Sequence, residues 1–151
     1  MFSLEYSEIQ EQIRDTARKF AREEILPSVI ERDKNAIYPR EIIEKLGELG
    51  FLGIMTSPEW GGSGLDAVSY AIAIEEICKI DASLGIVLSV QNSLNNWILE
   101  KYGTDQQKEK YLRPLAEGKM ISAFCLSEPE AGSDATRQNT TAQVINGKWV
   151  I

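Results

Sequence analysis

The sequence predicts a mainly α-helical chain, in which a bundle of about five helices is followed by the first strands of a β-barrel-like domain. Apolar residues recur at helical spacing through residues 7–118, in stretches bounded by capping residues. Further on, short apolar runs flank Asn146-Gly147, the dipeptide preferred in two-residue hairpin turns. We therefore expect a helical domain over 1–118 and the incomplete beginning of a β-domain over 119–151, in a truncated chain.

The first helix is predicted over residues 7–26. Ser7 and Gln10 fit a capping box, and Pro27 is expected to end the helix because it cannot continue the hydrogen-bonded ladder. The charged residues of this segment are expected to lie mostly on a solvated face. The buried face, spaced by three and four, comprises Ile9, Ile13, Ala17, Phe20 and Ala21.

Four more helices follow at residues 39–49, 66–80, 82–102 and 104–117. Their boundaries rest on a proline suited to a first helical position, on glycines suited to helix ends, and on a second capping box. The helix over 82–102 is apolar on most of its surface, which predicts a nearly central place in the bundle.

A glycine-rich loop over residues 57–64 separates the second and third helices. Three glycines within four positions suggest a phosphate cradle, but their spacing matches neither the dinucleotide fingerprint nor a P-loop. We therefore favour a simple turn over a phosphate site.

The central helix carries an unusual polar patch, Gln91-Asn92-Ser93 with Asn95-Asn96. Buried amides need hydrogen-bond partners, so these side chains face solvent, bond to neighbouring helices, or line a ligand cavity. Structural hydrogen bonding is the favoured interpretation.

Composition excludes several classes of function. The net charge of −7 argues against nucleic-acid binding, which needs clustered Lys and Arg. The absence of histidine removes Ser-His-Asp and Cys-His mechanisms and most zinc sites, so no metal site is expected. Cys78 and Cys125 are expected to be reduced, buried thiols. Residues 1–5 lack the features of a secretion signal and no apolar run is long enough to span a membrane, which predicts a cytoplasmic protein.

The chemistry of the chain is expected to lie near its C-terminal end. Residues 121–126 form an apolar run of strand length that leads to Ser127, after which Pro129 turns the chain. Gly132 would let the backbone approach a ligand beside Ser133. On composition alone, the alternative that these polar side chains bond locally as turn formers is favoured.

The order of residues 125–134, Cys-Leu-Ser-Glu-Pro-Glu-Ala-Gly-Ser-Asp, reverses that preference. It resembles the first recognition motif of the acyl-CoA dehydrogenase family: a small residue, an aliphatic residue, Ser or Thr, Glu, two free positions, a small residue, then Gly-Ser-Asp. Residues 58–66, 102–108 and 112–118 also resemble family segments. Arg137 departs from the pattern, because the family usually has a small residue there.

The resemblance implies a flavoenzyme that binds FAD and oxidises the Cα–Cβ bond of an acyl-CoA to the trans-2-enoyl-CoA, with hydride transfer to the flavin. It implies cofactor contacts from Phe124, Cys125, Leu126, Ser127, Gly132 and Ser133. Ser133 would also contact the acyl-CoA substrate. The family's catalytic glutamate comes from a C-terminal domain, so no catalytic residue is expected in this chain, and Glu128 is interpreted as a loop-stabilising residue.

The same resemblance implies electron transfer to an electron-transfer flavoprotein, assembly of the full-length enzyme as a homotetramer, and a preference closest to that of butyryl-type, short-chain members. The fragment itself is expected to be inactive. Two alternatives stay open on the residues: a non-catalytic helical interaction module, and a flavoenzyme of the acyl-CoA oxidase type.

Overall fold

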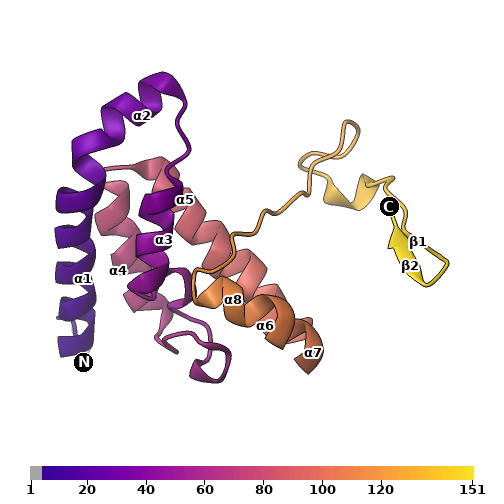
Figure 1. The fold of residues 1–151 in the computed structure, drawn as a ribbon, viewed down its shortest axis with the longest axis horizontal. Helices are drawn as coiled ribbons and strands as arrows, with labels where there is room; N and C mark the ends of the chain where they lie inside the picture. The colour runs from indigo at the N-terminus through magenta and orange to yellow at the C-terminus, as the bar shows by residue number, and fades with distance from the viewer. Residues whose placement is uncertain (1–4) are drawn as a thin grey trace.

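The helices that the sequence predicts form one body, which we call the helical body (Figure 1). The last part of the chain, residues 121–151, extends from it and is called the arm. The computed structural model describes residues 5–151. The prediction that residues 1–5 are no secretion signal therefore concerns a segment of which residues 1–4 lie outside the described residues. The mainly α-helical fold class is confirmed, and the sheet within 5–151 has two strands.

The first helix, α1 (Glu8–Phe20), begins as predicted, with the reciprocal capping box of Ser7 and Gln10. The prediction that Pro27 ends the helical path was wrong. A π-helical turn over Ala21–Ile25 and a 3-10 turn over Leu26–Ser28 lead directly into α2 (Val29–Asn35). Proline is tolerated here because the first turn of a helical segment needs no N–H from it.

The second predicted helix is α3 (Arg40–Glu48), and the third is α4 (Ala67–Cys78), capped by Asp66. A 3-10 turn over Phe51–Gly53 and another over Pro58–Trp60 lie between them.

The fourth helix runs from α5 (Ala82–Ser89) through a π-helical segment (Val90–Asn96) into α6 (Trp97–Tyr102). The fifth comprises α7 (Asp105–Gln107), a π-helical turn (Lys108–Leu112) and α8 (Arg113–Ala116). Its predicted capping box, between Thr104 and Gln107, is present.

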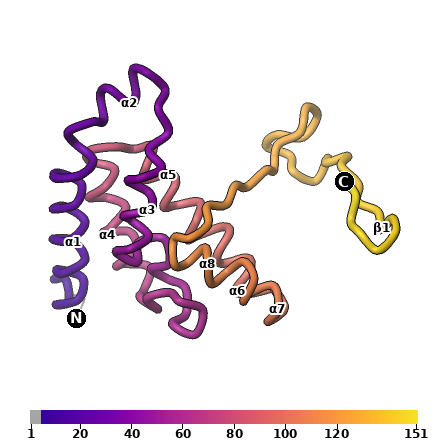
Figure 2. Tube along the Cα trace, viewed as in Figure 1, coloured from indigo at the N-terminus to yellow at the C-terminus, as the bar shows by residue number. Residues whose placement is uncertain are grey.

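The hydrophobic core lies among α1, α3, α4 and α5, with the 51–54 connection packed into it. The backbone path of these helices can be followed in Figure 2. Full burial of these side chains supplies the main stabilisation of the body. The fully buried members with the largest side chains are Ile25, Ile43, Leu46, Phe51, Leu52, Ile54, Ile77, Leu84 and Leu88.

Two ion pairs with buried carboxylates join helices across the body. Arg18 of α1 donates two hydrogen bonds, at 3.1 and 3.0 Å, to the buried carboxylate of Glu76 in α4. Arg32 of α2 donates at 2.7 Å to Asp81, which caps the N-terminus of α5. Arg18 is thus a partner in helix packing, in addition to lying at the edge of the solvated face.

The arm ends in an antiparallel hairpin of β1 (Gln143–Ile145) and β2 (Lys148–Val150). Both Asn146 and Gly147 have positive φ, as a type I′ turn requires, which confirms the predicted turn. The strand predicted over 121–126 is absent. Its backbone runs stretched out between the helices and the hairpin (Figure 1), but within residues 5–151 no second strand pairs with it. An apolar run becomes a strand only by pairing.

Both thiols are free, but the prediction that they are buried was wrong, since Cys78 and Cys125 are exposed. Cys78 ends α4 at the margin of the core, and Cys125 lies on the arm. The apolar character of cysteine was therefore not enough to predict whether these two thiols are buried.

Candidate cofactor-binding loop

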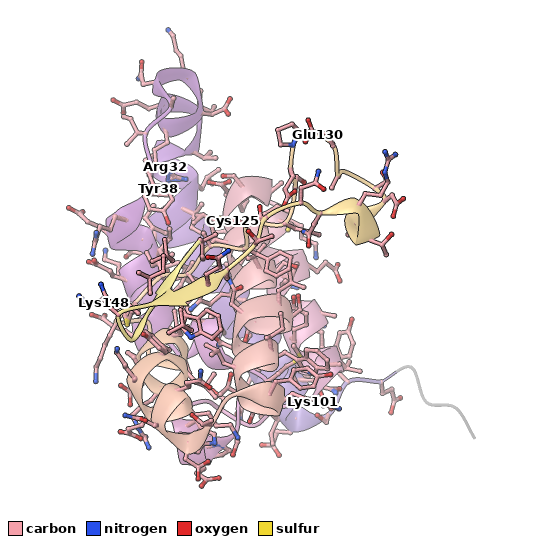
Figure 3. The ribbon with its side chains drawn as sticks, turned by 90° about the vertical axis from the view of Figure 1, so that its right-hand side faces the viewer. Arg32, Tyr38, Lys101, Cys125, Glu130 and Lys148 are labelled. Atoms are coloured by element: carbon pink, nitrogen blue, oxygen red, sulfur yellow. The ribbon has the colours of Figure 1, made fainter. Side chains whose placement is uncertain are left out.

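The predicted cofactor-contacting residues all lie on the arm, within the stretch 124–133, which stands away from the helices (Figure 1). Figure 3 labels Cys125 and Glu130 within it. Phe124 is 44% exposed and Leu126 is 40% exposed. Covering either apolar side chain with a ligand or another protein surface is favourable, because it removes apolar surface from water.

A tight turn gives this stretch its shape. The N–H of Glu128 donates to the carbonyl of Ala131 at 3.0 Å, and the N–H of Ala131 donates back at 3.1 Å. Pro129 occupies the second position of this four-residue turn, where its fixed φ is favourable. Ala131 is buried, unlike its neighbours.

Glu128 ties the turn to the chain that follows it. Its carboxylate accepts hydrogen bonds from the N–H groups of Asn139, at 2.6 Å, and Thr140, at 3.1 Å. Hydrogen bonds from the Thr140 side chain and from these backbone groups hold the pKa of Glu128 below its ordinary value. The interpretation of Glu128 as a loop-stabilising residue is confirmed.

A second tie was missed by the sequence reasoning. The side-chain amide of Gln138 donates to the carbonyl of Leu126 at 2.7 Å, next to the Ser127 position. Nothing in the local spacing indicates a partner twelve residues away. The departure from the family pattern at Arg137, the preceding residue, was the available signal that this part of the loop differs.

The turn leaves hydrogen-bonding groups and space available. The hydroxyls of Ser127 and Ser133 are exposed and make no hydrogen bond within residues 5–151. A Cβ added to Gly132 would meet no atom within 4 Å, so its backbone faces open space. A flat ring with polar edges fits such donors, and the residues present are compatible with FAD.

Two polar side chains of the central helix hold the base of the arm. The hydroxyl of Ser122 donates to the side-chain carbonyl of Gln91 at 2.8 Å and accepts from the side-chain amide of Asn95 at 2.7 Å. The sequence indicated polar residues on this helix but not their partner.

The remaining amides of the polar patch are structural, as favoured. Asn92 donates to the carbonyls of Phe51 and Leu88, and Asn96 donates to the carbonyl of Leu52. These bonds hold the 51–53 connection against the central helix. The side-chain carbonyl oxygens of Asn92 and Asn96 have no partner within the described chain.

The glycine-rich loop is a turn, as predicted, because its N–H groups are committed within the protein. The N–H groups of Ser63, Gly64 and Leu65 donate to carbonyls of residues 53–56 at 2.8–2.9 Å. No row of free donors is left to form a phosphate cradle.

Within residues 5–151, no group of three or more His, Cys, Asp or Glu side chains is arranged to hold a metal ion. No helix in the same range combines the length and apolar character needed to cross a bilayer.

The described chain is therefore a helical body followed by an exposed turn that carries a Ser-Glu-Pro sequence and a Gly-Ser-Asp sequence. Residues 7–119 match the family model for the acyl-CoA dehydrogenase N-terminal domain. The chain therefore belongs to the acyl-CoA dehydrogenase family.

Individual relatives agree. The chain is 42% identical to the short-chain-specific acyl-CoA dehydrogenase of Clostridium acetobutylicum, over 94% of this chain and 38% of that protein. A chain from a structure of the electron-transferring flavoprotein of Acidaminococcus fermentans superposes with a TM-score of 0.95 at 45% identity, covering 99% of this chain and 39% of the other. A glutaryl-CoA dehydrogenase from Mycobacterium smegmatis in complex with FADH2 gives 0.89 and 32%, covering 95% and 37%.

The chain thus spans less than two-fifths of the length of these relatives.

Proposed function

We propose that this chain forms the N-terminal part of an FAD-dependent acyl-CoA dehydrogenase, which oxidises the Cα–Cβ bond of an acyl-CoA to the trans-2-enoyl-CoA. The observation that carries the proposal is the motif loop over 124–133, which is held in shape by its own hydrogen bonds and presents unused donors. A loop shaped before it binds its ligand loses less conformational entropy on binding. The glutaryl-CoA dehydrogenase relative in complex with FADH2 supports the choice of cofactor.

Each proposed contact has a physical role. Phe124, Cys125 and Leu126 would supply apolar contact to the flavin ring, and the Ser127 hydroxyl would donate a hydrogen bond to its polar edge. Gly132 would admit the cofactor without a side chain in the way. Ser133 would hydrogen-bond both cofactor and substrate.

The chemistry of hydride acceptance belongs to the bound flavin. The residues of this chain bind and orient, and none of its carboxylates is proposed as the base. We propose that the 151-residue chain alone is inactive, because the resemblance to the family places the catalytic glutamate in a C-terminal domain and this chain spans less than two-fifths of the length of the relatives named above. The carboxylate of Glu128 is already occupied by the N–H groups of Asn139 and Thr140.

Domain organisation, partners and setting belong to the same proposal. Residues 1–118 would form the helical domain and residues 119–151 the beginning of a β-domain. The substrate would be a short-chain acyl-CoA, as the name of the Clostridium acetobutylicum relative suggests. The electron acceptor would be an electron-transfer flavoprotein, the protein named for the Acidaminococcus structure. The full-length enzyme would be a cytoplasmic homotetramer.

The test uses the complete protein that contains this chain, purified as wild type and as Gly132→Ala. Wild type should show flavin absorption and reduce a dye with butyryl-CoA. Without FAD, Gly132→Ala should unfold at the same temperature as wild type, because a Cβ there meets nothing. It should bind FAD about tenfold more weakly, as expected for lost close approach.

Two outcomes contradict the proposal. Wild-type protein that stays colourless when FAD is supplied would remove the flavin function and favour the non-catalytic interaction module. A yellow protein whose reduced flavin reacts rapidly with oxygen would favour the oxidase alternative.

A further inference from the structure

Within residues 6–151, the hydrogen bonds that join the arm to the helical body are all made by one residue of the arm, Ser122. Lys119 and Met120, which follow α8, still donate to the carbonyl of Pro114 within that helix. Across residues 6–151, the hydrogen bonds of Ser122 are then the last along the chain that connect the arm to the helices. Every later hydrogen bond of the arm is made within the arm.

Gln91 is built as a rigid receiver for Ser122. It is 2% exposed, and both ends of its amide are used. The NH₂ group donates to the carbonyl of Leu115 at 3.1 Å, while the oxygen accepts from the Ser122 hydroxyl at 2.8 Å and from the Ser122 N–H at 3.3 Å. A buried amide with all these partners cannot rotate without losing them, so its position is fixed by α8.

Asn95 fixes the orientation of the Ser122 hydroxyl. Its NH₂ group donates to that oxygen at 2.7 Å, so the hydroxyl accepts from one side chain and donates to the other. Gln91 and Asn95 both lie in the π-helical segment Val90–Asn96, which is a feature found at functional sites more often than elsewhere in helices.

Ser122 lies two residues before Phe124, the first of the proposed cofactor contacts. Two residues of extended chain span at most about 7 Å, so little freedom is gained between the anchor and the loop. A cofactor contact must be held to within about 0.5 Å to be effective, which requires supporting residues outside the contact shell.

We propose that Gln91 and Asn95, acting through Ser122, are positioning residues that set where the 124–133 loop stands relative to the helical body. The affinity and the absorption spectrum of a bound flavin then depend on three residues that do not touch it. This inference rests on the proposed flavin-binding function.

The experiment compares four forms of the complete protein: wild type, Ser122→Ala, Ser122→Thr and Ser93→Ala. Ser93 is the matched control, because its hydroxyl donates to the Ser89 carbonyl at 2.7 Å in the same helix and makes no hydrogen bond to the arm. Ser122→Thr keeps a hydroxyl and should behave as a conservative rescue. The readouts are amide hydrogen exchange over 123–127 without added flavin, and the FAD dissociation constant with the flavin spectrum.

Ser122→Ala should exchange faster over 123–127, bind FAD about tenfold more weakly and shift the flavin absorption, whereas Ser122→Thr and Ser93→Ala should stay close to wild type. Should Ser122→Ala fail to fold, Asn95→Ala removes one hydrogen bond to the same hydroxyl and carries the same expectations in smaller degree.

Unchanged exchange over 123–127 in Ser122→Ala would overturn the inference. So would faster exchange with wild-type FAD affinity and spectrum. If wild type binds no FAD, the proposed function fails, and the exchange measurement still decides whether Ser122 positions the arm.

Discussion

At the scale of single residues, two buried carboxylates, those of Glu76 and Asp81, accept hydrogen bonds from positively charged side chains of other helices. Glu76 is 5% exposed, and Arg18 and Lys79 both donate hydrogen bonds to it. Asp81 caps α5 and accepts a hydrogen bond from the buried Arg32. Burial alone would raise the pKa of Asp81, but hydrogen bonds from Ser83 and its other donors lower it.

The lowered pKa of Glu76 makes the stability of the fold depend on pH. The hydrogen bond from Arg18 is the largest cause, and together with the hydrogen bond from Lys79 and the two positive charges it outweighs burial and lowers the pKa of Glu76 from 4.5 to about 2. Because the folded-state pKa is the lower one, the carboxylate stabilises the fold above pH 4.5. That stabilisation is lost as the pH falls toward about 2.

The variant Glu76→Gln should therefore unfold more easily at pH 7, by roughly 1–2 kcal/mol because solvent screens the partly exposed Arg18 and Lys79. The difference from wild type should shrink between pH 4.5 and about 2, as followed by urea denaturation. Glu75→Gln is the control, since Glu75 also pairs with Lys79 but is 61% exposed. Equal effects of the two variants would contradict the argument.

At the scale of elements, α3 and the end of α8 meet through two glycines. A Cβ on Gly47 would lie 2.6 Å from the Cα of Gly118, and a Cβ on Gly118 would lie 2.5 Å from the Cα of Gly47. Gly118 also has φ of +73°, which disfavours other residues. The contact is between backbones, so no side-chain rotation can relieve an added methyl group.

Gly47→Ala should consequently destabilise the body by about 2 kcal/mol, because overpacking outweighs the higher helix propensity of alanine. Thermal unfolding followed by circular dichroism measures it. Gly132→Ala adds the same methyl group in open space and should leave the unfolding temperature unchanged. A stable Gly47→Ala protein would mean that α3 can move away from α8 at little cost.

The sequence predicted those elements whose signals are local. Ser7 with Gln10, and Thr104 with Gln107, mark helix starts by themselves, and Asn146-Gly147 specifies its own turn. The prediction that Pro27 ends the helical path was wrong because the π-helical turn before it leads into a new short helical segment, in which proline is tolerated. The run over 121–126 misled because a strand is defined by a neighbour that periodicity cannot supply.

The loop was predictable in part, through its motif and not through local spacing. Glu128 was identified as loop-stabilising from its place in that motif, although the residues that donate to it, Asn139 and Thr140, lie 11 and 12 residues away. The tie from Gln138 to Leu126 and that from Gln91 to Ser122 were not predictable, because each depends on how the backbone returns in space. The cofactor contacts themselves stay predictions.

At the scale of the whole molecule, burial divides the chain into two unequal parts. The buried hydrophobic residues lie in the helical body, with Ala131 the single exception within residues 5–151. Both strands of the hairpin are exposed along their whole length, and Trp149 is 73% exposed. A two-stranded hairpin without a buried face is marginally stable in water.

Hydrogen exchange of the 151-residue chain should show this division directly. Amides of α1, α4 and α5 should be protected to the level of global unfolding, whereas those over 123–151 should exchange by local opening. Mass spectrometry of peptic peptides provides the measurement. Protection of the hairpin equal to that of α4 would contradict this division, because it would show that the arm unfolds together with the helical body.

The glycine contact between α3 and α8 also orders events during synthesis. The ribosome delivers the chain from its N-terminus, so α1, α3 and α4 are available to pack before α8 has emerged. Gly118 is among the last residues of the helical body, and it can meet Gly47 only after it leaves the exit tunnel. The body can then close while the motif loop is still inside the tunnel, so the loop emerges next to a finished surface that binds the chain at Ser122.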